Sequence, residues 1–94
     1  MITELADLPV IPGQEDAFAA AYAKGAEYVL AAPGCLSARL VRGVESPSRF
    51  VALIEWATTE DHLAYLNSEG FAAFGALIGH FFADDPRVEH FIPS

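Results

Sequence analysis

The stretch RFVALIEWATTEDHLAYL, residues 49–66, joins a strand that is apolar on both faces to the start of a helix. Apolar residues recur on one face at the two-residue period of a strand: Phe50, Ala52, Ile54 and Trp56. The other face carries Val51 and Leu53. A strand that is buried on both sides needs a covering layer on both sides. The helices predicted for this chain can cover only one of them.

A short helix is predicted to follow this strand directly. Thr58 and Asp61 resemble a capping box, and the helix runs to about Leu66. The sequence Asn67-Ser68-Glu69-Gly70 interrupts it, and Ser68 can cap a second helical segment. Before Asp84-Asp85-Pro86, the apolar residues of that segment recur at helical spacing: Phe71, Phe74, Leu77, Ile78 and Phe81.

The remaining segments complete an alternation of strands and helices. Residues 2–11, 35–42 and 87–92 read as strands, and on the second of these one face is apolar: Leu36, Ala38 and Leu40. A helix of about 19 residues precedes Pro33-Gly34, and its apolar stripe is regular: Phe18, Tyr22, Gly25, Ala26 and Val29. The order β-α-β-β-α-β predicts one α+β domain over residues 1–94, a ferredoxin-like fold with an antiparallel sheet and helices on one face.

The composition excludes several classes of protein. A net charge of −8 with five scattered basic residues argues against binding to nucleic acid. The most apolar stretch, Phe71 to Ala83, is too short to span a membrane, and the N-terminus does not read as a signal peptide. Cys35 is the only cysteine, which fits a reducing compartment, and we expect a cytoplasmic protein. Hydrophobic residues make up 53% of the chain, more than a small core can absorb, which suggests oligomerisation.

Several short motifs are similar to those of a known family. Residues 10–18 read VIPGQEDAF, and PGC, SPSRFVALIEW, TTEDHLAYLNSEGFAAF and PRVEHF follow in order. Together these resemble the antibiotic biosynthesis monooxygenase family of the dimeric α+β barrel superfamily. The resemblance implies a homodimer in which two sheets pack face to face, which would cover the Val51 and Leu53 face. It also implies a pocket between the sheet and the helices of each subunit.

The resemblance carries over to individual site residues only in part. Quinone-forming oxygenases of this family carry Asn, Trp and Tyr where this sequence has Ala52, Trp56 and His62. The haem-degrading members use Asn, Trp and His at the positions of Ala6, Tyr65 and Gly75, so haem degradation is not expected. Other members place histidines at the positions of Tyr65 and Gly70, which are also missing here.

His62 is the predicted catalytic residue. Imidazole exchanges protons near neutral pH, and a neutral His62 could take a proton from a phenolic substrate, whose anion could then pass an electron to O2 without a cofactor. Trp56, Tyr65 and Phe71 are predicted to bind this small aromatic or apolar ligand. The predicted function is a cofactor-independent monooxygenase of a phenolic or polycyclic aromatic molecule. The alternative is a non-catalytic module that binds a small ligand or dimerises.

The other polar candidates are weaker. His80 lies near Asp84 and Asp85, and His90 lies beside Glu89, but no histidine pair has the spacing of metal ligands. No metal site is therefore expected. Cys35 follows Pro33-Gly34 at a strand start, where a buried, inert thiol is the simplest interpretation.

Overall fold

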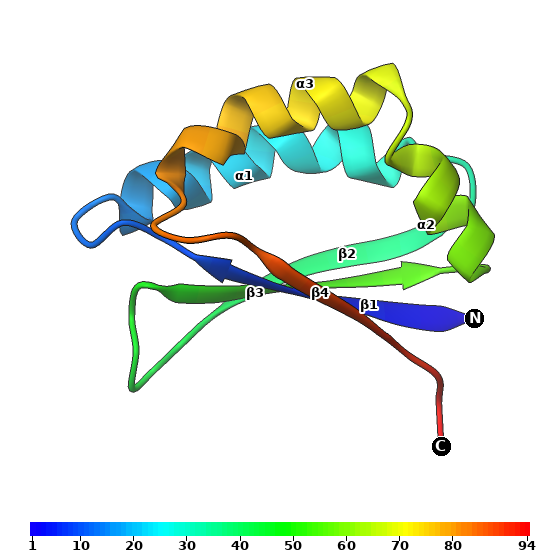
Figure 1. The fold of residues 1–94 in the computed structure, drawn as a ribbon, viewed down its shortest axis with the longest axis horizontal. Coiled ribbons are helices and arrows are strands. Elements are labelled where there is room, and N and C mark those ends of the chain that lie inside the picture. The colour runs from blue at the N-terminus through cyan, green and yellow to red at the C-terminus, as the bar shows by residue number, and fades with distance from the viewer.

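A computed structural model describes residues 1–94 as a four-stranded antiparallel sheet with helices on one face (Figure 1). The elements follow in this order: β1 (Ile2–Pro9), α1 (Glu15–Leu30), β2 (Cys35–Arg42), β3 (Arg49–Trp56), α2 (Thr59–Tyr65), α3 (Glu69–Ile78), a short 3-10 helix (Gly79–Phe81) and β4 (Arg87–Phe91). The predicted ferredoxin-like α+β fold is confirmed, with the second helical region divided into α2 and α3.

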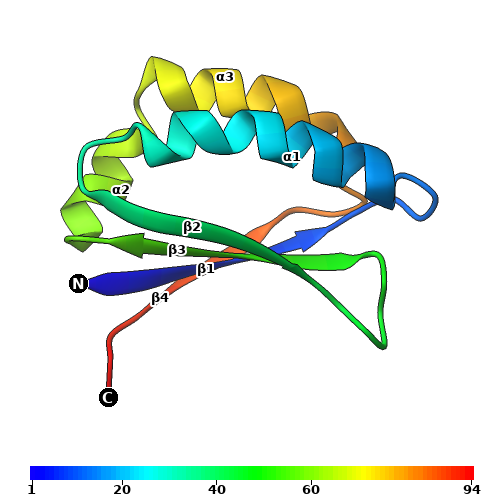
Figure 2. The same ribbon diagram turned by 180° about the vertical axis from the view of Figure 1, so that it is seen from behind.

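The strand order in the sheet is β2-β3-β1-β4, so β2 and β4 form its edges. β1 lies at the centre, and its Ala6 faces Ala52 of β3 on one side and Val88 of β4 on the other. α1 and α3 run side by side over one face, and α2 lies at one end of the sheet, as both views show (Figures 1 and 2). The ends of β1, β3 and β4 that lie nearest α2 therefore meet in one corner of the molecule.

The predicted apolar stripe of α1 faces the sheet. Phe18, Tyr22, Gly25 and Val29 are buried, and the Phe18 ring packs against Phe50 of β3 with 4.9 Å between ring centroids. Both predicted helix starts are also confirmed: Thr58 Oγ1 accepts the backbone N–H of Asp61, and Ser68 Oγ accepts that of Phe71. These two caps fix the separate directions of α2 and α3, because each satisfies a backbone donor that a continuous helix would have bonded internally.

Some predicted boundaries and one predicted orientation differ from the structure. α1 ends at Leu30, β1 at Pro9 and β4 at Phe91, each shorter than expected. Leu36 does not share the inward face of Ala38 and Leu40; its side chain is 57% exposed. The reason is an irregularity in the pairing of β2 with β3 between Cys35 and Ser37, which breaks the simple alternation of faces there.

The second face of the sheet has no helix over it (Figures 1 and 2). We call this the open face; it carries the alternate residues of the strands, among them Leu5, Val41, Val51, Leu53 and Phe91. Phe91 and Val41 are exposed, and the other three are half-buried. The covering layer that the Val51 and Leu53 pattern requires is therefore not supplied by the single chain.

Gly25 of α1 lies tightly against Phe74 of α3, which leads to a test of this packing. A Cβ atom at Gly25 would lie 2.6 Å from a ring carbon of Phe74, whereas a Cβ at Gly75 of α3 would meet nothing within 4 Å. We expect Gly25→Ala to lower the free energy of unfolding by about 1–3 kcal/mol through overpacking. Gly75→Ala should instead raise it by about 0.5–1 kcal/mol, because alanine favours the helix. Urea unfolding of both variants measures the difference, and equal effects would contradict the close approach.

Candidate functional site

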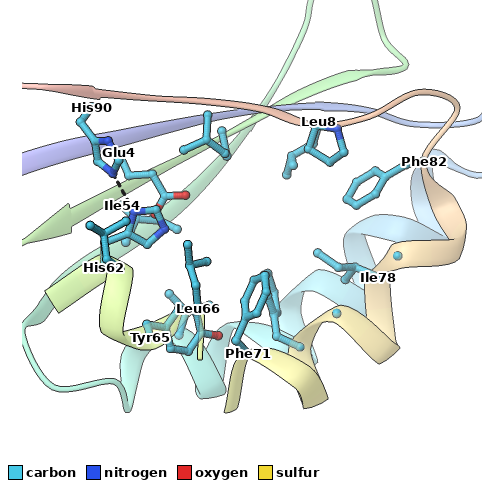
Figure 3. Close-up of a pocket in the computed structure, with 18 residues that line it drawn as sticks. Glu4, Leu8, Ile54, His62, Tyr65, Leu66, Phe71, Ile78, Phe82 and His90 are labelled. Atoms are coloured by element: carbon cyan, nitrogen blue, oxygen red, sulfur yellow. Dashed lines mark hydrogen bonds and ion pairs between the residues drawn. The ribbon is translucent and has the colours of Figure 1, made fainter. Parts of the chain in front are cut away.

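A cavity of about 380 Å³ lies between the sheet and the helices α2 and α3 (Figure 3). Most of its 18 lining residues are hydrophobic, and none of them is a lysine or an arginine. Figure 3 shows Ile78 and Phe82 at one end, and Glu4, His62 and His90 together at the other. The cavity is therefore an apolar chamber with one polar end.

The structure brings three of the four predicted site residues to this cavity. His62 and Tyr65 lie three residues apart on the same face of α2, and both line the cavity. Phe71, in the first turn of α3, also lines it, and its ring meets the Tyr65 ring edge-on at 5.5 Å. Trp56 does not line the cavity: it is completely buried at the end of β3, stacked on His62 with 5.2 Å between ring centroids.

The polar end is a continuous series of hydrogen-bonding groups from four elements. Trp56 Nε1 donates to Glu4 Oε1 at 2.9 Å, and His62 Nε2 lies 3.2 Å from the same oxygen. His62 Nδ1 lies 2.7 Å from His90 Nε2 (Figure 3). Glu4 and His90 face each other directly in the β1–β4 pair. Both nitrogens of His62 are thus engaged, one with a buried carboxylate and the other with a second imidazole.

Glu4 was not predicted from the sequence, and His90 was not assigned to the site. The inward position of Glu4 could have been recognised, since it alternates in step with Ala6 and Leu8, which are buried on the helix-covered face. His90 lies on the same face of the sheet as Val88, the face that the helices cover. Its place beside His62 depends on the register between the first and last strands, which no local pattern in the sequence indicates.

Burial governs the protonation of this group. It raises the pKa of Glu4 above its usual value. The hydrogen bond from Trp56 and the nearby His90 oppose that rise. Burial also lowers the pKa of His62, and His90 adds to the decrease. The neutral His62 on which the sequence prediction depends is therefore favoured mainly by burial.

The hydrogen bonds assign the position of the ring protons when Glu4 is ionised. Neutral imidazole has one donor and one acceptor nitrogen, and the carboxylate can only accept. His62 therefore carries its proton on Nε2, which lies 3.2 Å from the Glu4 carboxylate oxygen. Its Nδ1 accepts the proton of His90 Nε2, which gives every bond in the series one donor.

Two buried hydroxyls have no hydrogen-bond partner in the protein. These are the hydroxyl oxygens of Tyr22 and Tyr65. Burial is the main reason that the pKa of each is raised to about 12, so both remain protonated near neutral pH. Because Tyr65 lines the cavity, it offers a hydrogen-bond donor that a ligand oxygen could satisfy.

The same cavity gives little support for a bound cofactor or metal. No group of three or more His, Cys, Asp or Glu side chains could hold a metal ion. The lining has no cationic side chain to pair with a phosphate.

Two other residues considered in the sequence lie outside the cavity. His80 is exposed. Burial raises the pKa of the Cys35 thiol. No helix is long and apolar enough to cross a membrane, and the location of the protein in the cell stays a prediction.

Comparisons with known proteins agree with the fold. A family model for antibiotic biosynthesis monooxygenases matches residues 1–77. The uncharacterized protein YczJ of Bacillus subtilis is 30% identical over 92 residues, covering 97% of both chains. A solved structure from Bordetella bronchiseptica that carries the same family name is similar with a TM-score of 0.96 and 32% identity, covering 99% of this chain and 96% of that one. SnoaB, a cofactor-independent oxygenase from Streptomyces nogalater, has the same fold at 17% identity, with a TM-score of 0.86 over 99% of this chain and 92% of its own.

The buried, neutral state of His62 predicts a specific dependence of stability on pH. The pKa of His62 in the folded protein lies below 6.5. As the pH falls, His62 therefore binds a proton in the unfolded chain before it does so in the folded protein. The stability it contributes is present above about pH 6.5 and is lost as the pH falls through the folded pKa. Glu4 acts in the opposite sense, since its pKa is raised above 4.5: its contribution is present below about pH 4.5 and is lost as the pH rises through the folded pKa.

We therefore expect His62→Gln to reduce the loss of unfolding free energy that the unsubstituted protein shows between about pH 7 and about pH 5.5. Urea unfolding at the two pH values measures it. His80→Gln, at an exposed histidine, should keep the original dependence. A His62→Gln variant with the unchanged dependence would show that His62 is not held neutral by burial.

Proposed function

The chain belongs to the antibiotic biosynthesis monooxygenase family, and on that basis we propose that it is a cofactor-independent monooxygenase of a phenolic or polycyclic aromatic molecule. The observation that carries the proposal is the close contact of His62 with Glu4, 3.2 Å between Nε2 and Oε1, at one end of an apolar cavity. Its volume of about 380 Å³ fits a small flat ligand. The apolar walls favour an aromatic ring system over a charged metabolite.

The proposed reaction begins with removal of a proton from the substrate. His62 and the Glu4 carboxylate act as one acid–base unit, which takes a proton from a phenolic O–H or an activated C–H. The resulting electron-rich anion gives one electron to O2, and the two radicals combine to form a C–O bond. Protonation of this peroxide and loss of water leave a carbonyl, so a CH2 group and O2 become C=O and H2O.

The other predicted residues take supporting roles in this proposal. Trp56 acts through Glu4 and His62, because it donates to one and stacks on the other without reaching the cavity. Tyr65 donates its free hydroxyl to a substrate oxygen, which would give that buried group the partner it lacks. Phe71 contributes an apolar wall beside Tyr65.

The alternative function is a non-catalytic module that binds a small ligand. The observation that favours it is the loss of the Asn and Tyr of the quinone-forming oxygenases, whose positions are taken here by Ala52 and His62. Ala52 is buried and does not line the cavity, so it offers no polar group in place of the lost Asn. Catalysis and simple binding are distinguished by oxygen consumption.

We expect the purified protein, free of flavin and metal, to consume O2 when mixed with an anthrone- or hydroquinone-type substrate. His62→Ala should lower kcat by about 100-fold or more, the usual contribution of an acid–base group. Tyr65→Phe should raise KM by about 10-fold through loss of one hydrogen bond to the substrate. His80→Ala, outside the cavity, is the control and should leave both values unchanged.

Two results would contradict this proposal. Oxygen uptake that does not exceed that of buffer, with ligand binding retained, would favour the non-catalytic alternative. Full activity in a folded His62→Ala variant would remove His62 from the chemistry.

We also propose that the protein is a homodimer that associates through the open face. That face carries apolar side chains of all four strands, including the half-buried Leu5, Val51 and Leu53, and no part of the chain covers it. Burial of these side chains against a second copy would remove apolar surface from water. This is the arrangement that the family resemblance implies.

Light scattering at micromolar concentration should therefore give about twice the monomer mass of 10.1 kDa. Leu53→Glu places a charge in the centre of the open face and should produce monomers. Tyr28→Glu, an equally drastic change on the helix layer, is the matched control and should leave the dimer intact. A monomeric protein before any substitution would refute the proposal.

A further inference from the structure

We propose that Glu4, His62 and His90 form a proton relay between the cavity and the solvent, in which Glu4 exchanges protons with the substrate and His90 with water. The proposal rests on the proposed oxygenase function for its substrate. It also gives Glu4 and His90 roles of their own: the proposed function treats Glu4 only as part of one unit with His62 and gives His90 no role. Glu4 is then a catalytic residue, and His90 completes its connection to the surface.

The three side chains form a series without a gap. Glu4 Oε1 lies 3.2 Å from His62 Nε2, and His62 Nδ1 lies 2.7 Å from His90 Nε2. Glu4 is 6% exposed and His62 5% exposed, whereas His90 is exposed on the edge strand β4. Nδ1 of His90 makes no hydrogen bond to the protein. The series therefore runs from a buried carboxylate to an imidazole nitrogen that water can reach.

A proton can pass inward along this series by three transfers. Water protonates Nδ1 of His90, whose Nε2–H bond then breaks as a new N–H bond forms at His62 Nδ1. The His62 Nε2–H bond breaks in turn as an O–H bond forms on Glu4. The charge of the added proton ends on the carboxylate, which becomes neutral, and both imidazoles remain neutral.

Outward passage uses the same contacts in reverse. It starts from the tautomers that inward passage leaves, with the ring protons of His62 and His90 on Nδ1. Once Glu4 has given its proton to the peroxide and taken one from the next substrate, its carboxyl donates that proton to the free His62 Nε2. His62 then donates from Nδ1 to His90 Nε2, and His90 releases its Nδ1 proton to water. Glu4 is ionised again at the end, and both rings carry their protons on Nε2, which sets the series for the next inward passage.

The charges around the series suit this role. Glu4 is the acidic group that lines the cavity, and Trp56 of β3 faces it as a neutral N–H donor. Tyr22 of α1 and Tyr65 of α2 also lie near it, and both remain protonated because burial raises the pKa of each to about 12. No lysine or arginine lines the cavity to hold Glu4 permanently ionised. The raised pKa of Glu4 makes its carboxylate a stronger base than an exposed one.

The proposed dimer leaves this path open. His90 lies opposite Glu4 on the helix-covered side of the sheet, whereas its neighbours Glu89 and Phe91 face the open side. A second copy packed on the open face would cover Phe91 and leave the His90 ring beside His62.

The experiment compares three variants of the whole protein in the oxygen-uptake assay. Glu4→Gln keeps an oxygen that can accept from Trp56 and His62 but cannot take up a proton, and kcat should fall by about 100-fold or more. His90→Ala should lower kcat by at least about 10-fold, and added imidazole should restore it by replacing the missing ring. His80→Ala should behave like the unsubstituted protein with or without imidazole.

A second measurement does not depend on turnover. Nitrogen-15 NMR of the histidine rings should show the His62 proton on Nε2 and a hydrogen bond accepted at Nδ1, and His90→Ala should remove that bond. Unchanged His62 signals in His90→Ala would overturn the relay, as would full turnover in a folded Glu4→Gln variant. If the unsubstituted protein consumes no O2 at all, the oxygenase proposal fails, and the NMR result alone decides whether the relay exists.

Discussion

The burial of one carboxylate controls the arrangement of the site. Glu4 comes from the central strand and points under the helices, where an unpaired charge would be very costly. Its oxygen receives the Trp56 N–H from β3 and the His62 ring from α2, so three elements must reach the same point. This requirement fixes the position of α2, a helix of only seven residues. A helix that short has little stability of its own.

The same interaction explains why the cavity has its polar groups at a single end. The alternate residues of β1 that follow Glu4 on its face are Ala6 and Leu8, which form an apolar floor. α3 adds aromatic and aliphatic side chains opposite that floor. The two of them that Figure 3 labels, Phe71 and Ile78, are both apolar. A ligand that enters is thus desolvated along most of its length and meets ionisable groups only at one end.

The sequence predicted the fold because its patterns are local and strongly periodic. The stripe of α1 and the alternation of β3 each place the right residues in the core, and two serine or threonine caps mark the break between α2 and α3. Strand ends were less exact, since fraying and bulges depend on neighbouring strands rather than on the segment itself. The exposed Leu36 is the clearest example.

The site was predicted only in part, for a different physical reason. His62, Tyr65 and Phe71 were found because they lie close together in the sequence and were judged by their own chemistry. Glu4 and His90 meet them through the pairing of the first and last strands, a contact that spans nearly the whole chain. The consequence of that pairing for His62 is that both of its nitrogens are engaged, which residue type alone does not indicate.

The edge strand β4 forms one wall of the cavity. All five residues of this edge strand are exposed, and Val88 and His90 both line the cavity. Edge elements with few buried contacts open locally at the lowest cost in free energy. An outward movement of β4 would widen the cavity and separate His90 from His62 at the same time. A flat ligand would then enter in the same movement that breaks the contact between His62 and His90. The site would be complete only after β4 had closed over the ligand.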